Sequence, residues 1–252
     1  MRRLLSLLLI PAAVLSLGAR ADTIKVLTAG AFKQIVVSAQ PAFEARTGHT
    51  LDIQNDTAGA LARRIAGGER FDVLVLTNGA LQPIGTSGRV VAASITPLAK
   101  VGIGVAVKAG APELKIDTAE AFKQALLDAR KVAYIDPASG GSSGIYLDGL
   151  FQRMGISDAI KAKAVLVPGG LVAERLVTGE ADLAVHQVSE ILPVSGVSFV
   201  GPLPEGVQNY TVYAGAVASD SEHADAARAF LASMAVPEMA GTLRFKGMMP
   251  LP

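Results

Sequence analysis

Small and hydroxyl residues recur where an expected strand gives way to a helix. They occupy residues 28–31 (TAGA), 56–59 (DTAG) and 139–144 (SGGSSG). A helix start leaves backbone N–H groups without partners and carries partial positive charge. Small side chains let a ligand approach that backbone, so these junctions can bind an oxyanion without a buried lysine or arginine. The candidate ligand contacts at the junctions are Gly30, Ala31, Thr57, Ala58, Ser142, Ser143 and Gly144.

Compact turns are the simpler explanation for any one of these junctions taken alone. In open parallel sheets, however, the loops at the carboxyl ends of the strands are where ligands bind. Three such junctions at equivalent strand ends therefore favour a ligand site as strongly as they favour turns.

Polar side chains at two further strand ends are candidates for the same site. Gln187 follows an expected strand at 182–185, and its amide can donate to an oxyanion without a change of charge. Asn78 follows the apolar run FDVLVLT, and its side-chain amide can donate in the same way. His186 precedes Gln187, although a histidine satisfied by a nearby backbone group is the commoner outcome. Tyr146, in the helix after the third junction, either closes over a ligand or packs in the core.

The third junction also matches a catalytic pattern. GGSSG fits the nucleophile elbow G-x-S-x-G of hydrolases, with Ser142 as the nucleophile. The elbow needs its serine directly after a strand, whereas residues 136–139 intervene here after KVAYI. His186 and His223 are the available bases, and nothing in the sequence places either of them near Ser142. The phosphate-cradling pattern G-x-x-x-x-G-K-[ST] is absent, which disfavours an NTPase.

Composition excludes several classes of function. The chain has no cysteine, so disulfides, thiolate metal sites and cysteine nucleophiles are excluded. The three histidines, His49, His186 and His223, lack the spacing of a zinc or copper site. We expect no metal and no other cofactor. A near-neutral charge balance without a basic run gives no support for nucleic-acid binding.

The first 21 residues have the pattern of a cleaved export signal. Arg2 and Arg3 form a positive start, residues 4–17 are mostly apolar, and residues 19–21 (ARA) offer the small residues that signal peptidase reads. The apolar run is short and proline-interrupted for a membrane span, which needs about 20 residues. We expect cleavage before Asp22 and a soluble exported protein of 252 − 21 = 231 residues, whose formal net charge is +1 − 3 = −2 after three arginines are removed.

Strands and helices alternate along the mature chain, which predicts an α/β fold with parallel-rich sheets flanked by helices. The apolar segments 101–107 and 211–218 are long and far apart in sequence. We expect them to make two hinge crossings between two lobes, the first formed by 22–104 and 213–252, the second by 105–212. The expected strands are 24–28, 51–54, 71–76, 101–107, 131–135, 165–167, 182–185 and 211–218; the expected helices are 32–46, one around 61–65, one capped by Asp117, 145–154, 171–177 and 223–235.

The motifs and their order resemble those of the periplasmic molybdate-binding proteins of ABC importers, over nearly the whole mature chain. The resemblance rests on IKVLTAGAF, TAGALARRIAGGERFDVLVL, VAYIDPASGGSSGIY, VTGEADLAVHQVSEI and KGMMP. It implies a two-lobed, type II solute-binding fold that closes over a small anion, a membrane permease as partner and a monomeric state. By motif, the family's ligand contacts fall near Gly30 and Ala31, near Thr57 and Ala58, at Ser143 and at Gln187.

Three departures from the family pattern point away from molybdate itself. Ala31 follows Gly30 where a serine is usual, Gln187 stands where a tyrosine is usual, and GGSSG replaces V-P-A-G. The segments VAYIDPASG, HQVSE and TVYAGAV also resemble a smaller group of periplasmic relatives that isomerise aconitate. Such an isomerase moves a proton on a tricarboxylate and needs an acid–base group near the cleft, for which His186 and Tyr146 are the candidates.

The sequence therefore supports three hypotheses in order. The first is a solute-binding protein that takes a molybdate-like oxyanion or a small organic acid for an ABC importer. The second is a periplasmic isomerase of a small carboxylate. The third is an exported serine hydrolase that uses Ser142.

Overall fold

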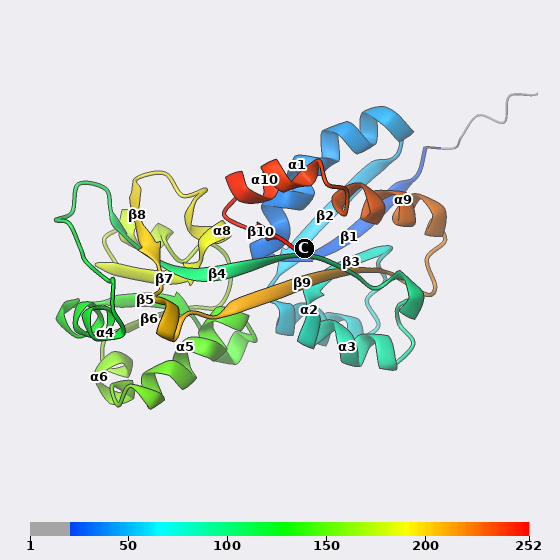
Figure 1. The fold of residues 1–252 in the computed structure, drawn as a ribbon. Coiled ribbons are helices and arrows are strands. Elements are labelled where there is room, and N and C mark those ends of the chain that lie inside the picture. Colours follow the sequence, from blue (N-terminus) through cyan, green and yellow to red (C-terminus); the bar gives the residue numbers. More distant parts are fainter. Residues whose placement is uncertain (1–20, 252) are drawn as a thin grey trace, which may run out of the picture.

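Continuous apolar runs build the sheet of the computed structural model, which describes residues 21–251 (Figure 1). The expected export signal lies outside this range, apart from its last residue. β1 (Thr23–Ala29), β3 (Val73–Thr77), β5 (Val132–Ile135) and β7 (Leu183–Gln187) are almost wholly buried, as parallel strands covered by helices should be. The other strands are β2 (Thr50–Asp56), β4 (Thr96–Lys108), β6 (Ala164–Val167), β8 (Val197–Pro202), β9 (Tyr210–Val217) and β10 (Met249–Pro250).

The strand order is β2-β1-β3-β9-β4-β7-β5-β6, and β8 and β10 also pair with β4. β1 pairs in parallel with β2 and β3, and β5 pairs in parallel with β6 and β7. β4 and β9 run antiparallel to their neighbours. The structure thus confirms an α/β fold rich in parallel strands, with an antiparallel centre.

Hydrophobic side chains gather on two sides of this centre. One core draws on residues 24–101 and 213–248, and we call the part of the molecule around it the first lobe. Two adjoining clusters draw on residues 103–203, and we call the part around them the second lobe. The expected two-lobed architecture is visible in Figure 1, where β4 runs through both lobes.

Helices cover both faces of each lobe. In Figure 1, α1 (Gly30–Thr47), α9 (Ala224–Met234) and α10 (Met239–Phe245) lie on one face of the first lobe, and α2 (Ala58–Ala66) and α3 (Asn78–Thr86) lie on the other. No helix among the described residues has both the length and the apolar character that a membrane span requires. The remaining helices, from residue 119 to residue 191, are α4 (Ala119–Asp128), α5 (Ser142–Arg153), α6 (Ser157–Lys161), α7 (Glu174–Val177) and α8 (Val188–Ile191).

Several local expectations need correction. α3 was not expected, because its glycines and Pro83 mask a helical pattern. Thr118, and not Asp117, caps α4: its hydroxyl accepts a hydrogen bond from the Ala121 N–H at 3.0 Å. The two strands expected to cross between the lobes also differ. β4 spans both lobes, whereas β9 pairs only with β3 and with residues 96–102 of β4.

Gln208 lies just before β9, on the segment by which the chain returns from the second lobe to the first. Its side-chain carbonyl accepts from the Ile103 N–H at 2.8 Å, and its amide donates to the Ile103 carbonyl at 2.9 Å. Along this edge of β4, pairing with β9 ends at Gly102 and pairing with β8 begins at Gly104. The side chain of Gln208 therefore pairs with the position between the two strands, where the Leu203 N–H also donates to the Ile103 carbonyl at 2.9 Å.

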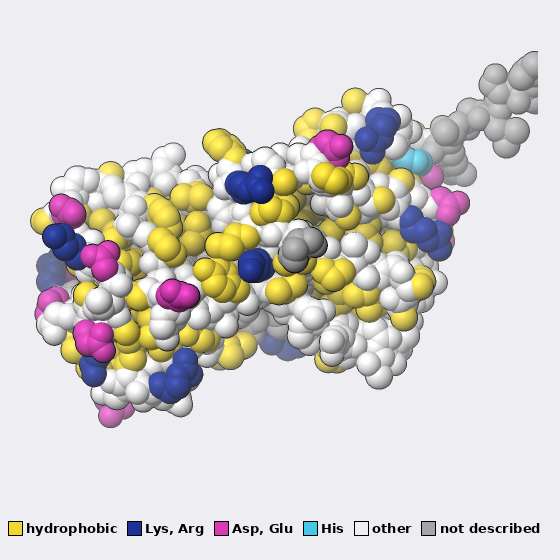
Figure 2. All heavy atoms as spheres, viewed as in Figure 1, with side chains coloured by type: hydrophobic (Ala, Val, Ile, Leu, Met, Phe, Trp, Pro, Cys, Tyr) yellow, Lys and Arg dark blue, Asp and Glu magenta, His cyan; other side chains and the backbone are white. Residues whose placement is uncertain are grey.

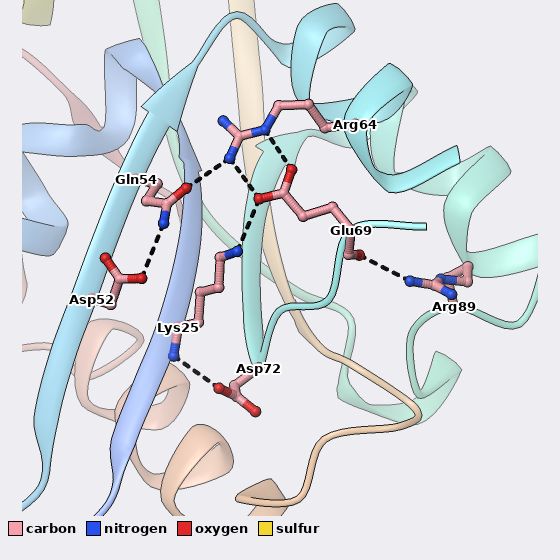
Figure 3. A network of polar contacts seen from close by, with 7 residues as sticks. All are labelled: Lys25, Asp52, Gln54, Arg64, Glu69, Asp72 and Arg89. Atoms are coloured by element: carbon pink, nitrogen blue, oxygen red, sulfur yellow. Dashed lines mark hydrogen bonds and ion pairs between the residues drawn. The ribbon is translucent and has the colours of Figure 1, made fainter. Parts of the chain in front are cut away.

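An ion-pair network fixes α2 to the sheet of the first lobe (Figure 3). Arg64, near the end of α2, donates to both carboxylate oxygens of Glu69, at 2.5 and 2.6 Å, and to Gln54 on β2 at 2.7 Å. Lys25 on β1 donates to the same carboxylate at 2.9 Å. Because one end of α2 is held in this way, the network also sets the direction in which the other end, at Thr57, points.

The pKa of Glu69 gives a test of this network. Hydrogen bonds first from Arg64 and then from Lys25 lower that pKa from 4.5 to about 2. The ionised form thus stabilises the fold above pH 4.5, and the effect is lost as the pH falls toward about 2. We expect Glu69→Gln to lower the free energy of unfolding at pH 7 by about 1 kcal/mol, since partial exposure screens the network.

Urea unfolding at pH 7 and pH 3 measures this difference, which should narrow at the lower pH. Glu180→Gln is the matched control, because Glu180 binds Arg175 at 3.0 Å on the surface, where such a pair contributes little. A difference between wild type and Glu69→Gln that is the same at both pH values would contradict the linkage.

Candidate functional site

A cavity lies where junctions of the first lobe meet the third junction and β7 of the second lobe. Its volume is about 30 Å³, on a scale where one water molecule needs about 10–15 Å³. Water fits, and a ligand of several heavy atoms enters only when the lobes separate. The cavity is lined by Ala29, Gly30, Ala31, Asp56, Thr57, Ala58, Ile135, Gly141, Ser142, Ser143, Gly170, His186, Gln187, Glu190 and Tyr213.

The structure brings most of the expected contacts together at this cavity, although they come from four separate stretches of the chain. The residues that line it as expected are Gly30, Ala31, Thr57, Ala58, Ser142, Ser143 and Gln187.

Three expected contacts lie elsewhere. Asn78 begins α3 and is absent from the cavity lining. The hydroxyl of Tyr146 donates to the Val207 carbonyl at 2.9 Å, and its ring packs against the second-lobe core, so the core explanation is the right one. Gly144 is small for a packing reason, since a Cβ there would collide with the carbonyl oxygen of Ile135. This glycine lets α5 pack against the end of β5.

Two long helices point uncapped starts at the cavity. α1, of 18 residues, begins after Ala29 in the first lobe, and α5, of 12 residues, begins after Gly141 in the second. Neither start has a side-chain cap, whereas the Thr57 hydroxyl caps α2 by accepting from the Ala60 N–H at 3.1 Å. First-turn N–H groups of α1 and α5 are thus available to an anion from opposite lobes.

The attraction for an anion is local. None of the described residues that line the cavity is a lysine or an arginine. On the face in Figure 2, basic and acidic side chains are interspersed over both lobes. The partial positive charge of helix starts and the hydroxyls of Ser142 and Ser143 are therefore the groups that favour negative charge here.

Glu190 is the functional candidate that the sequence analysis missed. It lies on α8, four residues after His186, and its Oε2 is 3.2 Å from His186 Nε2. His186 is 1% exposed and Glu190 is 8% exposed. The spacing H-x-x-x-E across the end of β7 was the available signal, and the sequence analysis did not use it.

Burial keeps this pair uncharged. Desolvation raises the pKa of Glu190 to about 8 and lowers the pKa of His186 to about 3. Both shifts favour the neutral forms, so at neutral pH the contact joins a carboxylic acid and a neutral imidazole. A group whose pKa lies near neutrality can both give up and take back a proton.

Close packing brings the Glu190 carboxyl to the start of α1. Its Oε1 lies 2.5 Å from the point where a Cβ on Gly30 would stand, so a larger residue at position 30 would displace it. The neighbouring Ser189 hydroxyl donates to the Ala31 carbonyl at 2.8 Å. α8 is thereby docked on α1, and the acid is held beside an anion-attracting helix start.

Two polar atoms at the cavity have no hydrogen-bond partner in the described part of the chain: Nδ1 of His186 and Oε1 of Gln187. The amide of Gln187 donates to the Ser142 hydroxyl at 3.1 Å and to the Thr211 hydroxyl at 3.2 Å. A buried polar atom without a partner costs about 1–3 kcal/mol. Oε1 of Gln187 only accepts, so it suits a donor on a ligand, whereas Nδ1 of His186 donates or accepts according to its tautomer.

The contacts of Ser142 weaken the hydrolase hypothesis. Among the described hydrogen bonds, the Ser142 hydroxyl accepts from Gln187 and has no histidine partner. His186 is engaged with Glu190, and His223 approaches Asp22 at 3.4 Å. No group of three or more potential metal ligands occurs in the described range either. The groups that line the cavity can bind an anion and transfer a proton.

The raised pKa of Glu190 predicts a dependence of stability on pH. The folded state keeps this proton up to about pH 8, whereas an unfolded chain releases it near 4.5. The stabilisation is complete below pH 4.5 and is lost as the pH rises through about 8. In Glu190→Gln, which cannot ionise, we expect the free energy of unfolding to fall less between pH 5 and pH 8.5, as measured by urea titration. Glu205→Gln, at an exposed position, is the control, and equal slopes in all three proteins would refute the shift.

Comparisons with known proteins agree with this geometry and confirm the resemblance drawn from the motifs. One relative, named aconitate isomerase and from Pseudomonas sp, is 37% identical over 236 residues, covering 91% of this chain and 88% of that protein. The Azotobacter vinelandii periplasmic molybdate-binding protein has the same fold, with a TM-score of 0.78 at 18% identity over 91% of this chain and 99% of that one. The sulfate-binding protein SubI from Mycobacterium tuberculosis H37Rv also has this fold, with a TM-score of 0.74 at 17% identity over 91% of this chain and 87% of that one. Residues 24–249 match the model of the bacterial extracellular solute-binding proteins, and the chain belongs to that family.

Proposed function

We propose that this protein is a periplasmic isomerase of a small polycarboxylate, of the aconitate type. The observation that carries the proposal is the buried His186–Glu190 pair, 3.2 Å apart, at a cavity between two uncapped helix starts. A buried acid whose pKa lies near neutrality, at the wall of a cavity, is a candidate for acid–base chemistry. The relative named aconitate isomerase, at 37% identity, supports the same substrate class.

Binding uses the groups that attract negative charge. One substrate carboxylate faces the start of α1 at Gly30 and Ala31, and another faces the start of α5 at Ser142 and Ser143. Because the two starts belong to different lobes, a substrate with several carboxylates is held only when the lobes close. Thr57 also lines the cavity, but its hydroxyl already donates to the Ser139 carbonyl at 2.7 Å.

The reaction needs one proton to move along a three-carbon unit. The ionised Glu190 takes a proton from the methylene carbon, the electron pair shifts the double bond by one carbon, and the same carboxyl returns the proton to the former alkene carbon. No proton is gained or lost overall. Glu190 is therefore the general base and then the general acid. His186 is a positioning residue, whose Nε2 holds the carboxyl in place.

Replacement of the base should abolish turnover and spare binding. We expect Glu190→Gln to lower kcat by about 10²–10⁴-fold, the usual contribution of a positioned acid–base group. His186→Asn should lower it less and shift the pH profile. Proton NMR of trans-aconitate conversion to the cis isomer measures the rate, and thermal unfolding with trans-aconitate measures binding. Wild-type kcat in Glu190→Gln would remove this residue from the mechanism, and no turnover by concentrated wild type would remove the substrate.

The pH profile provides a second check on the base. Since only the ionised carboxylate accepts a proton, kcat should rise with pH and level off near the Glu190 pKa of about 8. His186→Asn should move the plateau while Glu205→Gln leaves it in place. A flat profile between pH 6 and pH 9 would contradict the assignment.

A transport receptor is the second candidate, and the folds of the molybdate- and sulfate-binding neighbours favour it. In that case the closed protein would deliver an anion to a membrane permease and act as a monomer in the periplasm. Thermal unfolding with molybdate, tungstate, sulfate, citrate and trans-aconitate separates the candidates. A ligand at 100 times its Kd stabilises the fold by about 2.7 kcal/mol. A shift with tetrahedral oxyanions alone favours the receptor, and a shift with carboxylates alone favours the isomerase.

A further inference from the structure

The two lobes touch directly beside the cavity, through groups that belong to the protein alone. The first turn of α2, in the first lobe, meets η2 (Pro137–Ser139) and Gly140, in the second. The Gly59 N–H donates to the Gly140 carbonyl at 3.1 Å. The Thr57 hydroxyl and the Arg63 guanidinium both donate to the Ser139 carbonyl, at 2.7 and 3.2 Å.

This contact requires two glycines. A Cβ on Gly59 would stand 2.7 Å from the Gly140 Cα, and a Cβ on Gly140 would stand 2.6 Å from the Gly59 Cα. Backbone atoms cannot give way as a flexible side chain can. Neither glycine lines the cavity. The lack of a side chain at these two positions therefore lets one lobe approach the other. The sequence pattern had suggested instead that it lets a ligand approach the backbone.

We infer that Gly59, Gly140 and the hydrogen bonds to Ser139 form a latch that holds the lobes closed before any ligand arrives. The protein is then already closed in its ligand-free state. Entry to a cavity of about 30 Å³ requires the latch to open, and the apparent affinity for a ligand depends on how often it does so. The inference concerns the ligand-free protein and stands or falls independently of the proposed reaction.

Gly59→Ala tests the latch, and Gly79→Ala is an unusually close control. Each glycine is the second residue of a nine-residue helix that follows a capping threonine. A Cβ on Gly79 meets nothing within 4 Å. Alanine also favours the helix over glycine. Both variants should therefore fold with a melting temperature at or above that of wild type, and only Gly59→Ala should hinder closure.

Spin labels report the separation of the lobes. The chain has no cysteine, so labels go to Gln82→Cys on α3 and Lys161→Cys on α6, both exposed positions in different lobes. Double electron–electron resonance on ligand-free protein should give one narrow distance distribution for wild type and for Gly79→Ala. In Gly59→Ala we expect the distribution to move to longer distances.

A further variant covers the case in which Gly59→Ala does not unfold cooperatively. Arg63→Ala removes one of the three hydrogen bonds without adding bulk, and it should shift the distribution in the same direction by less. An unchanged distribution in the folded variants would overturn the latch. A wild-type distribution that is already broad without ligand would do the same.

Discussion

Desolvation of one carboxyl–imidazole pair is the constraint on which the rest of the site depends. Glu190 and His186 can remain neutral and in contact only while both lobes exclude water from them. That exclusion needs α8 docked on α1, which the Ser189 hydroxyl secures at 2.8 Å, and it needs a glycine at position 30 to leave room for the carboxyl. The sheet, the helix starts and the closed lobes together exclude water from this pair.

The network at the far end of α2 belongs to the same arrangement. Arg64 and Glu69 anchor the end of the helix that points away from the cavity, while Thr57 and Gly59 at its other end contact the ligand site and the second lobe. A helix fixed at one end transmits its position to the other. The first lobe therefore presents a rigid edge to the second at α2, beside the docking of α8 on α1.

The sequence predicted the fold class and most buried strands, because continuous apolar runs such as FDVLVL leave little alternative. It also predicted seven of the cavity residues, since helix starts with small residues at strand ends meet at one edge of a sheet. It failed where the reason for smallness was packing: Gly144 gives room to a carbonyl of β5, and Gly59 gives room to the opposite lobe. Spacing alone cannot separate these uses of glycine.

Glu190 escaped the sequence analysis for a different reason. Its side chain is buried only because α8, a single turn of four residues, packs against a helix more than 150 positions earlier in the chain. No local pattern records that contact. Tyr146 shows the converse, since an aromatic residue near a glycine-rich loop looked available to a ligand but donates to Val207 within the second lobe.

The place of Gln208 has a consequence for how the molecule bends. At one position on the edge of β4, a side-chain amide stands in for a neighbouring strand by pairing with both polar groups of Ile103. A side chain can rotate about its own bonds and keep both hydrogen bonds, whereas a strand would have to be peeled away. The Leu203 N–H also donates to the Ile103 carbonyl at 2.9 Å. Residue 103 therefore keeps its partners where the ladder along this edge changes from β9 to β8, and a swing of one lobe on the other at this point need not expose unpaired backbone.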